Sequence, residues 1–333
     1  MTAKVLEVED LVVTIHTASG VLTAIDGVSF ELHEGEVLGL VGESGSGKTL
    51  TGRAILRLLP SRRMAIQRGA IRLNGEDITK FDETRMRRVR GRSVGMIFQN
   101  PTSHLDPVMT VGSQIAESIR FYEGLPRKES LVRAAELLRQ VDIPDPAVRL
   151  SSFPHEFSGG MRQRVMIAAA LACRPKILIA DEPTTALDVT VQAQILRLLL
   201  GLRERRGLSI ILVTHDLGVV AQTCDTVAVM YAGRLLERAP KRNLLRGTLH
   251  PYTMGLIASQ PGKGKPREEL PSIFGQQPSL SDLPEGCRFH PRCDYSEAQC
   301  RAAVPPLEEV DVNHQTACRR WRELAKQKIL GAA

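Results

Sequence analysis

The chain has 333 residues, of which 43% are hydrophobic and 24% are charged, as in an ordinary globular protein. This length allows one large domain with a buried core and a smaller second domain. The formal net charge of +7 suits an anionic ligand or an anionic membrane surface. Aromatic residues make up only 4% of the chain, which argues against a surface that stacks nucleic-acid bases.

The apolar runs of the sequence argue against a segment that enters or crosses a membrane. The first ten residues contain no apolar core of signal-peptide length. The longest apolar runs, such as residues 165–173, are far too short to span a bilayer. We therefore expect a protein of the cytosol or of a membrane surface. The basic run at residues 85–92 has no interleaved aromatic residue, which favours a solvated face over nucleic-acid binding.

A glycine-rich segment lies between a predicted strand and a predicted helix. Residues 5–30 alternate β-type runs with turn residues, which predicts an antiparallel sheet. The apolar run at residues 36–42 then indicates a buried parallel strand, and residues 48–59 show helical spacing until Pro60. The segment between them reads GESGSGKT and fits the pattern G-x-x-x-x-G-K-[ST]. This context predicts a phosphate-binding loop rather than a chance glycine-rich turn.

The residue types in this loop suit a nucleotide. Glycines let successive backbone N–H groups turn inward around phosphate oxygens. Lys48 adds a positive charge, and the hydroxyl of Thr49 can bind Mg²⁺. Free amides and the helix dipole at the start of the next helix also favour an anion. The expected nucleotide ligands are Gly42, Glu43, Ser44, Gly45, Ser46, Gly47, Lys48 and Thr49.

The rest of the chain up to residue 256 predicts a parallel α/β core with a helical insertion. The helical pattern covers residues 101–154 and includes a helix over residues 129–141. Four apolar residues share one face of that helix: Leu131, Ala135, Leu138 and Val141. The other expected elements are a hairpin at 69–78, strands at 94–99, 177–183, 209–215 and 226–233, and a helix at 191–205.

Two acids follow the buried strand of residues 177–183, at its carboxyl end, where α/β folds bind ligands. We expect Asp181 to hold Mg²⁺ and Glu182 to polarise an attacking water. Taken alone, such a pair is equally typical of helix capping. Downstream of a phosphate loop, the catalytic interpretation is favoured.

The segment FSGGM places Ser158, Gly159 and Gly160 at the start of another predicted helix. A hydroxyl and exposed amides there would form a second anion site. A plain serine N-cap followed by a glycine turn gives the same pattern. Because one chain needs only one site for the γ-phosphate, the second anion site indicates that this segment binds the nucleotide of a neighbouring molecule.

These segments, with Gln99, TALD at residues 185–188 and VTHD at residues 213–216, resemble in their order the ABC transporter ATPases. The resemblance covers about residues 5–256. It implies a P-loop NTPase core with an N-terminal antiparallel β subdomain and a helical insertion at about residues 101–155. It places the ABC nucleotide-binding domain at residues 1–257.

The resemblance also implies roles for single residues. Gln99 would contact Mg²⁺ and water and would sense the permease. Ser158, Gly159 and Gly160 would close on the ATP of a partner subunit. The remaining roles are a dimer-interface aspartate, Asp188, and a switch histidine at the γ-phosphate, His215. The expected catalytic set is Lys48, Gln99, Glu182 and His215, and the expected Mg²⁺ ligands are Thr49, Gln99 and Asp181.

Two positions depart from the family's pattern. Met161 follows the signature glycines where glutamine is commonest, and we expect this to tune the site without disabling it. Ile15 stands 27 residues before Gly42, where the family usually stacks an aromatic ring on adenine. Weaker adenine affinity and a substitute role for the adjacent His16 both stay open.

The composition changes after about residue 257. Residues 259–286 contain five prolines and four glycines and predict no long regular element. Four thiols in a tail without its own core indicate a metal staple. Their spacing is not the C-x₂-C of common zinc ribbons, whereas a [4Fe–4S] cluster accepts varied spacing. An iron–sulfur cluster, Zn²⁺ and free thiols all stay open at this point, with His314 as an alternative ligand. The four cysteines are Cys287, Cys293, Cys300 and Cys318.

The segment LHPYTMGL at residues 249–256 and the cysteine segments look like the C-terminal extension of dipeptide and oligopeptide importer ATPases. This resemblance implies a small irregular extension at residues 258–333 and favours the [4Fe–4S] cluster in a structural role. It also implies a second ATPase subunit, identical or paralogous, two transmembrane permeases and an extracytoplasmic solute-binding protein, with no nucleic acid. The location it implies is peripheral, on the cytoplasmic face of a bacterial inner membrane.

The resemblance leaves the transported solute open, because the ATPase is not expected to touch it. Dipeptides and longer peptides are favoured, and nickel complexes, glycosides and opines are alternatives. A non-transport ABC ATPase acting on DNA or ribosomes is a rival. Such proteins usually carry two cassettes, a long coiled coil or a charged arm, and this sequence shows none of them.

Overall fold

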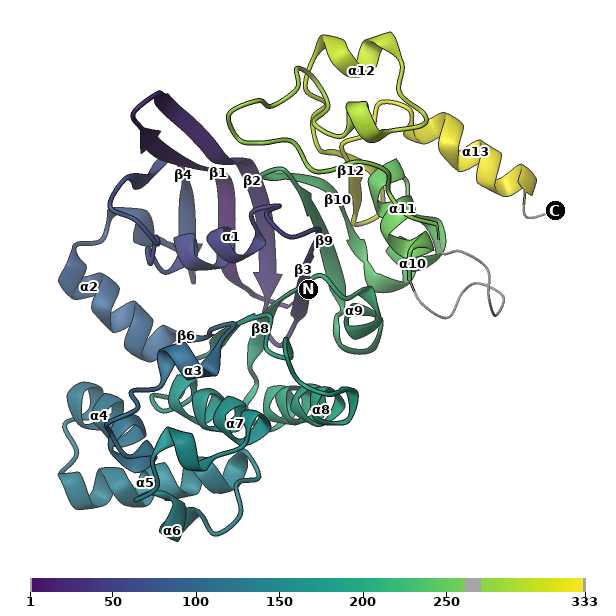
Figure 1. Cartoon of the computed structure of the whole chain (residues 1–333). Coiled ribbons are helices and arrows are strands. Elements are labelled where there is room, and N and C mark those ends of the chain that lie inside the picture. The colour runs from purple at the N-terminus through teal and green to yellow at the C-terminus, as the bar shows by residue number, and fades with distance from the viewer. Residues whose placement is uncertain (1, 261–270, 332–333) are drawn as a thin grey trace. The chain divides into compact units, whose positions relative to one another are not determined.

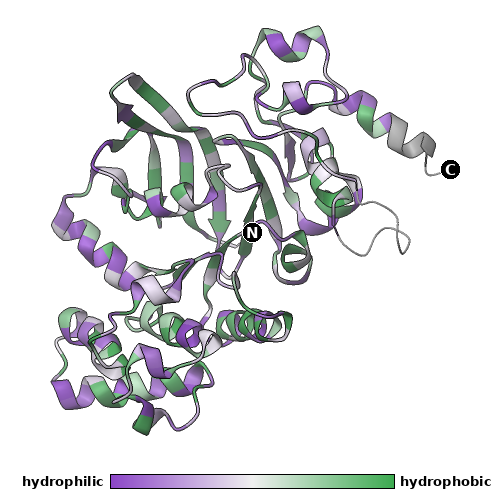
Figure 2. Ribbon diagram, in the orientation of Figure 1, coloured by the Kyte–Doolittle hydropathy of each residue, from purple (hydrophilic) through white to green (hydrophobic). Residues whose placement is uncertain are grey.

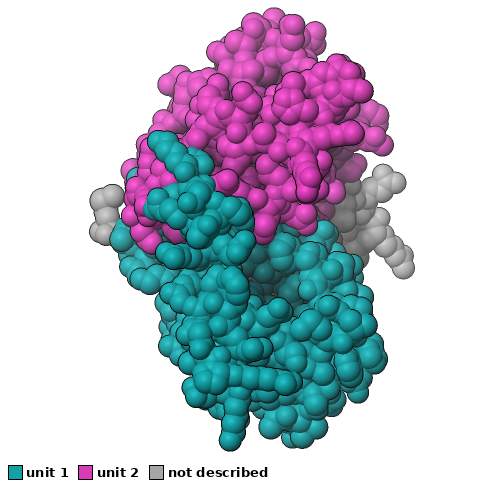
Figure 3. Space-filling view, turned by 90° about the vertical axis from the view of Figure 1, so that its left-hand side faces the viewer, with its two compact units in different colours: residues 1–5, 33–36, 78–213 teal, residues 6–32, 37–77, 214–333 magenta. Residues whose placement is uncertain are grey.

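The computed structural model describes residues 2–260 and 271–331, so residues 261–270 of the Pro- and Gly-rich segment lie outside the described residues. The chain divides into two compact units, coloured separately in Figure 3. Unit 1 comprises residues 1–5, 33–36 and 78–213. Unit 2 comprises residues 6–32, 37–77 and 214–333.

The parallel strands of unit 1 are β6 (Val94–Ile97), β7 (Ile177–Asp181) and β8 (Ser209–Thr214), with β7 paired to both of the others. Every residue of these strands is buried. Continuous burial explains why they read as unbroken apolar runs, since parallel strands are covered on both faces. The strands predicted at 94–99, 177–183 and 209–215 are confirmed.

Helices make up most of the remaining regular structure of unit 1, and many of them come from the predicted helical insertion (Figure 1). The long helix after β7 is also confirmed. The bounds are η1 (Ile78–Lys80), α2 (Glu83–Arg88), the π-helical turn η2 (Val89–Ser93), α3 (Pro101–His104), α4 (Val111–Glu123), α5 (Arg127–Gln140), α6 (Pro146–Arg149), η3 (Pro154–Glu156), α7 (Gly159–Ala170) and α8 (Val189–Arg206).

The helix predicted at residues 129–141 is α5, but its buried face differs slightly from the predicted one. Leu138 is buried, as is Val141 directly after the helix, whereas Leu131 and Ala135 are only half-buried. The neighbouring positions Ala134 and Leu137 are buried instead. Two adjacent apolar stripes lie on this helix, and spacing alone does not say which one faces the core.

The basic run at residues 85–92 lies on α2 and the turn η2. The residues Arg85, Arg87, Arg88 and Arg92 are exposed, while Met86 anchors the helix in the core. Figure 2 shows α2 as mainly hydrophilic. The run is therefore a solvated helix face, as predicted.

Unit 2 contains an antiparallel sheet in the order β2-β1-β4-β5, which matches the sheet predicted at its N-terminal part. The hairpin predicted at residues 69–78 is β4 and β5, paired through Leu73 and Glu76. Asn74 and Gly75 both have positive φ, at 50° and 84°, as a tight two-residue hairpin turn requires. The bounds are β1 (Lys4–Thr17), β2 (Gly20–His33), β4 (Met64–Leu73) and β5 (Glu76–Asp77).

The other strands of unit 2 follow the order β11-β12-β10-β9-β3. The strand β3 pairs in parallel with β9, and β9 pairs antiparallel with β10. The extension contributes β12, which pairs with the edge strand β10, and β11, which pairs with β12, so it is more regular than the resemblance implies. This pairing uses backbone groups that an exposed edge strand would leave open. The bounds are β3 (Val37–Val41), β9 (Thr226–Tyr231), β10 (Arg234–Pro240), β11 (Glu308–Asp311) and β12 (His314–Thr316).

The helix after β3 is α1, and it is shorter than the predicted span of residues 48–59. It ends at Ile55, and Arg57 takes a left-handed φ of 53°. No helix in the described part of the chain is long and apolar enough to cross a membrane. The helices of unit 2 are α1 (Lys48–Ile55), α9 (Leu217–Thr223), α10 (Lys241–Gly247), α11 (Pro251–Ala258), η4 (His290–Arg292), α12 (Ala298–Ala302) and α13 (Trp321–Gly331).

An aromatic cluster joins the extension to the core of unit 2. Phe289 of the extension lies 5.4 Å from Tyr231 of β9 and 5.3 Å from Tyr252 of α11, measured between ring centroids. All three side chains are at most 3% exposed. Burial of such large rings is a strong apolar contact, so this part of the extension is packed as core.

Candidate functional site

The phosphate loop, residues 42–49, lies in unit 2 between β3 and α1, in the predicted strand–loop–helix order. Gly42 has a φ of 153°, and a Cβ atom there would collide with the carbonyl oxygen of Met230. Gly47 is the N-cap of α1, with a φ of 103° and no side-chain cap. The first amides of α1 therefore have no capping side chain, which suits an anion at this end of the helix.

The side chain of Lys48 is only 4% exposed and is bonded to the loop itself. Its ammonium group donates to the carbonyl oxygens of Gly42 and Glu43, each at 2.8 Å. The hydroxyl oxygen of Ser46 lies 3.4 Å away. A buried ammonium needs such acceptors, and here they hold its charge among the loop residues.

In unit 1 the structure brings Gln99 and Glu182 together. The amide Nε2 of Gln99 donates to Oε2 of Glu182 at 2.8 Å, and the Thr185 hydroxyl donates to the same oxygen at 2.9 Å. The partnership of Thr185 with Glu182 is visible only in the structure. The only signal in the sequence is its position three residues after Glu182.

The backbone at Glu182 is strained. Its φ is 45°, in the left-handed region, and its amide donates to the carbonyl oxygen of Val213 at 3.0 Å. A non-glycine residue in this conformation costs on the order of 1 kcal/mol and is often found at functional sites. The residue before it, Asp181, is the last residue of β7 and is 0% exposed. The strand end therefore presents a buried acid and a half-buried acid held at a fixed angle.

The signature segment begins α7 in unit 1. Ser158 is the N-cap, and its Oγ accepts a bond from the Met161 amide at 3.4 Å. A Cβ at Gly160 would lie 2.7 Å from Cγ1 of Val191 in α8, so close packing explains that glycine. Ser158 and Gly159 are exposed. Ser158 thus caps α7, and both Ser158 and Gly159 remain accessible.

The TALD segment leads into α8. Asp188 is the N-cap of that helix and accepts a bond from the Val191 amide at 2.9 Å. Ala186 has a left-handed φ of 64°. Val189, the first residue of α8, is 81% exposed. Both Asp188 and Val189 are therefore accessible at the surface of unit 1.

His215 lies in unit 2 directly after β8 and is exposed. Its neighbour Asp216 caps α9 and accepts bonds from the amides of Gly218 and Val219, at 2.7 and 3.3 Å. Ile15, near the end of β1, is half-buried and pairs with Met64 of β4. The adjacent His16 is exposed.

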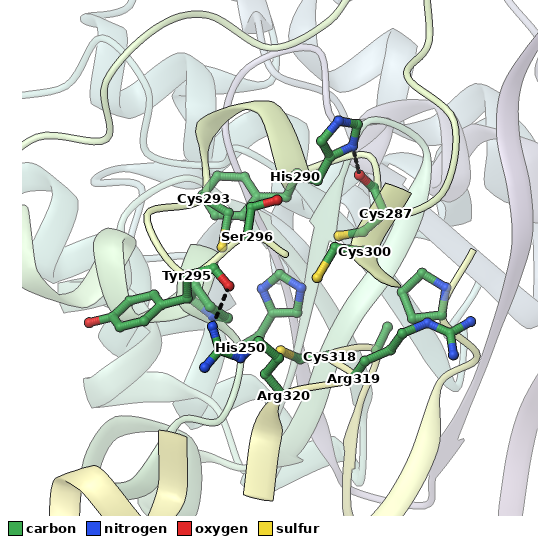
Figure 4. Close-up of a pocket in the computed structure, with 14 residues that line it drawn as sticks. His250, Cys287, His290, Cys293, Tyr295, Ser296, Cys300, Cys318, Arg319 and Arg320 are labelled. Carbon is green, nitrogen blue, oxygen red and sulfur yellow. Dashed lines mark hydrogen bonds between the residues drawn. The ribbon is translucent and has the colours of Figure 1, made fainter. Parts of the chain in front are cut away.

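The four cysteines of the extension line one cavity, which we call the cysteine cavity (Figure 4). The amide of Cys287 donates to the carbonyl oxygen of Cys300 at 2.8 Å, and the turn η4 lies between Cys287 and Cys293. Cys318 follows β12. Three segments separated in sequence therefore supply the thiols, as the metal-staple interpretation requires.

The arrangement of the thiols in this cavity and their protonation, which burial sets, both bear on metal binding. Among the described residues there is no group of three or more His, Cys, Asp or Glu side chains that could hold a single metal ion. Burial raises the pKa of Cys293 to about 11 and that of Cys318 to about 12. Without a bound cation these thiols are neutral at physiological pH.

His314 is not available as a ligand of the cysteine cavity. Its Nε2 lies 2.8 Å from Oε1 of Glu237, and both side chains are buried. Thr248 and the amide of Leu249 also donate to this carboxylate, each at 2.7 Å. Burial would raise the pKa of Glu237, but the bonds from His314, Leu249 and Thr248 together lower it. His314 instead holds β12 against β10.

Comparisons with known proteins fit this arrangement. A family model described as "ABC transporter" matches residues 25–185, and one described as "Oligopeptide/dipeptide transporter, C-terminal region" matches residues 236–300. A putative peptide import ATP-binding protein of Brucella abortus (strain 2308) is 47% identical over 332 residues, covering 96% of this chain and 98% of that protein. The chain belongs to the ABC transporter ATPases.

A second relative and two solved structures agree with this membership. A probable peptide ABC transporter ATP-binding protein of Sinorhizobium fredii is 48% identical over 320 residues, covering 96% of each chain. The cassette MJ0796, in a dimeric post-hydrolysis state with ADP and Pi, has a TM-score of 0.64 and 26% identity, covering 71% of this chain and 99% of that chain. The cbiO1 protein of Clostridium perfringens has a TM-score of 0.63 and 27% identity, covering 74% of this chain and 92% of that chain.

These comparisons confirm the predicted family and fold class. As a member of this family, the chain is an ATP-hydrolysing enzyme. The ABC transporter match includes the phosphate loop, Gln99, the signature segment and Glu182. The C-terminal match includes Cys287, Cys293 and Cys300.

Proposed function

We propose that this ABC ATPase energises the import of dipeptides or oligopeptides through an ABC transporter. One observation carries the proposal: a full set of ABC nucleotide motifs is joined to a C-terminal region that matches oligopeptide and dipeptide transporters over residues 236–300. Relatives named for peptide import match nearly the whole chain, which supports the same solute class. The proposed domains are the nucleotide-binding domain, residues 1–257, and the extension, residues 258–333.

The proposed partners are a second ATPase subunit, two transmembrane permeases and an extracytoplasmic solute-binding protein. The exposed Ser158, Gly159 and Asp188 support a subunit interface, because accessible amides and an acid beside an exposed Val189 suit a surface that pairs. The second subunit is a copy of this chain or a paralogue. We place the complex at the bacterial inner membrane, with this chain on its cytoplasmic face.

Glu182 is the proposed general base. Gln99 and Thr185 both donate to its Oε2, so the carboxylate is held in one orientation before water arrives. A base held in this way can accept a proton from water as the water attacks the γ-phosphate in line. Lys48, and His215 in the switch role, would stabilise the charge that develops on the phosphate.

Mg²⁺ is the proposed companion of ATP. The hydroxyl of Thr49, the carboxylate of Asp181 and the amide of Gln99 are hard oxygen donors of the kind this ion prefers, and Asp181 is fully buried. When bound, the ion would neutralise charge on the β- and γ-phosphate oxygens. Thr49 would offer its hydroxyl oxygen from the start of α1, Asp181 its carboxylate from the end of β7, and Gln99 its amide oxygen from the segment after β6.

We further propose that the cysteine cavity holds a [4Fe–4S] cluster in a structural role. Four thiols from separate segments surround one cavity, which supports a metal centre that staples those segments. A single zinc ion needs its four sulfur atoms within about 2.3 Å, whereas each iron of a cluster needs only one cysteine. The cysteine spacing supports the cluster over zinc, because it is not the C-x₂-C of common zinc ribbons.

Reconstituted transport tests the proposed solute. The chain, its permease pair and its binding protein are placed in vesicles, and uptake of a labelled dipeptide is compared with uptake of a glycoside and of a nickel complex. ATP-dependent uptake of the dipeptide alone is the expected result. Uptake of only one of the other solutes would contradict the peptide proposal while leaving the ATPase intact.

Metal analysis tests the proposed cluster. Protein purified without oxygen should contain about four irons per chain, with matching acid-labile sulfide. Cys318→Ser should lose most of this iron, whereas Cys173→Ser, which changes a cysteine outside the cavity, should keep it. About one zinc per chain, or no metal at all, would contradict the proposal.

A further inference from the structure

One arginine of the extension contacts the phosphate loop directly. The guanidinium of Arg292 donates from Nη1 to Oε2 of Glu43 at 2.8 Å and from Nη2 to Oε1 at 3.1 Å. The side chain of Arg292 is 7% exposed, and that of Glu43 is 27% exposed. Two parallel bonds at low exposure form a bidentate pair, which is stronger and more directional than a surface ion pair.

The same guanidinium holds the segment of the extension that precedes the cysteines. It donates to the carbonyl oxygens of Ile273, Phe274 and Gly275, at 3.3, 2.9 and 3.1 Å. Its Nη1 also lies 3.3 Å from the hydroxyl of Tyr231 in β9. All its donors therefore meet acceptors, which fixes the position of the charge.

Two further bonds support the same loop. The amide of Glu43 donates to the hydroxyl of Tyr252 at 2.8 Å, so this residue is held by both its backbone and its side chain. Nε2 of Gln277, in the extension, donates to the carbonyl oxygen of Gly45 at 3.1 Å. Glu43 and Gly45 both lie within the glycine-rich turn that is expected to surround the phosphates.

Arg292 compensates the negative charge of an acidic residue in this loop. Glu43 is an acid within the segment that must accept the negatively charged phosphates of ATP, and an unpaired carboxylate there would repel them. Pairing with Arg292 neutralises that charge. Holding the loop before the nucleotide arrives also reduces the conformational entropy that is lost on binding.

We propose that the extension supports the phosphate loop, with Arg292 as a positioning residue that neutralises Glu43 and preorganises the loop for ATP. The inference rests on the proposed use of this loop as the ATP site. It gives the extension a role in nucleotide affinity, beyond holding a metal centre. Neither the family roles nor the comparisons assign such a role to Arg292, Glu43 or Gln277.

The rest of the extension is attached independently of Arg292, so the proposal can be tested without unfolding it. Arg288 is buried, donates to the carbonyl oxygen of Ala232 and forms an ion pair with Asp26 of β2. The pairing of β12 with β10 and the packing of Phe289 provide further attachment. Loss of the Arg292 side chain should therefore leave the extension folded.

The test measures MgATP affinity and steady-state hydrolysis for the full chain. Arg292→Gln should weaken ATP binding and raise KM about tenfold, while kcat stays nearly unchanged, because Arg292 does not touch the reacting atoms. Arg292→Lys, which keeps the charge but not the bidentate geometry, should show an intermediate loss. Melting curves establish that each variant is folded. If Arg292→Gln does not fold, Arg292→Lys is used to test the proposal.

A double-mutant cycle separates this role from simple packing. In the Glu43→Gln background, Arg292→Gln should change affinity by no more than about threefold, because the repelling charge is already gone. The matched control is Arg320→Gln, whose ion pairs with Glu297 and Glu323 lie within the extension. This control should leave ATP affinity unchanged.

Two results would overturn the proposal. One is an Arg292→Gln chain that binds ATP as tightly as wild type. The other is an equal loss of affinity with and without the Glu43 carboxylate. A wild-type chain that binds no ATP would count instead against the proposed function of the loop.

Discussion

The phosphate loop and the cysteine cavity are both in unit 2, yet they are built in opposite ways. The loop is one continuous segment, residues 42–49, whose glycines adopt positive φ angles and whose backbone forms the site. The cavity draws four thiols from segments that are up to 31 residues apart, Cys287 to Cys318. A site made of backbone needs a particular local sequence, whereas a site made of side chains needs a fold that brings them together.

This difference explains how specific each sequence signal was. Only glycine tolerates the φ of 153° at position 42, so the motif and its geometry imply each other. The cysteine spacing was compatible with more than one metal centre and with His314 as an alternative coordinating residue. The structure removes His314 by pairing it with Glu237. The side-chain site thus depends on contacts that local sequence does not contain.

The largest expected effect tests whether the continuous motifs carry the chemistry. Glu182→Gln should lower kcat about a thousandfold while ATP still binds, because the amide cannot accept the proton from water. Phosphate release and nucleotide binding are measured on the same preparation. Glu156→Gln makes the same change at an exposed carboxylate of η3 and should keep wild-type turnover. Turnover within a few-fold of wild type in Glu182→Gln would remove Glu182 as the base.

The next largest effect concerns the side-chain contacts that hold the extension. Glu237→Gln should cost about 3 kcal/mol, because it replaces the buried charged partner of His314. Folding lowers the pKa of Glu237 below its ordinary value of 4.5, so its contribution is present above that pH and is lost as pH falls through the folded pKa. Denaturant unfolding at several pH values checks both statements.

The single tryptophan of the chain, Trp321 in α13, gives a fluorescence signal from the extension itself. The stability gap between wild type and Glu237→Gln should shrink below pH 4.5. Glu308→Gln, at an exposed position of β11, is the control and should match wild type at each pH. A gap that stays constant down to strongly acidic pH would mean that the Glu237 charge is not what stabilises this contact.

The smallest expected effect returns to the motifs. Gly160→Ala should cost about 2 kcal/mol, because its Cβ would lie 2.7 Å from Cγ1 of Val191. Gly159→Ala is a matched control, since its Cβ would lie 3.7 Å from Leu187, an ordinary contact. Urea unfolding measures both. Val191→Ala should relieve most of the cost of Gly160→Ala, and equal costs for the two glycines would exclude packing as the reason.

Local sequence determined much of this protein. Buried parallel strands such as β3 and β7 are covered on both faces and therefore read as continuous apolar runs. The Asn74–Gly75 hairpin and the glycines of the phosphate loop followed from backbone conformations that few residues adopt. The family resemblance rested on such segments in a fixed order.

Only the tertiary structure decided the contacts between distant residues. The stripe that α5 buries, the shared carboxylate oxygen that joins Gln99, Thr185 and Glu182, and the pairing of β12 with β10 all join such residues. The ion pair of Arg292 with Glu43 spans 249 positions of the chain. The physical reason is that a backbone conformation is chosen by neighbouring residues, whereas a side-chain partner is chosen by the packing of the whole unit.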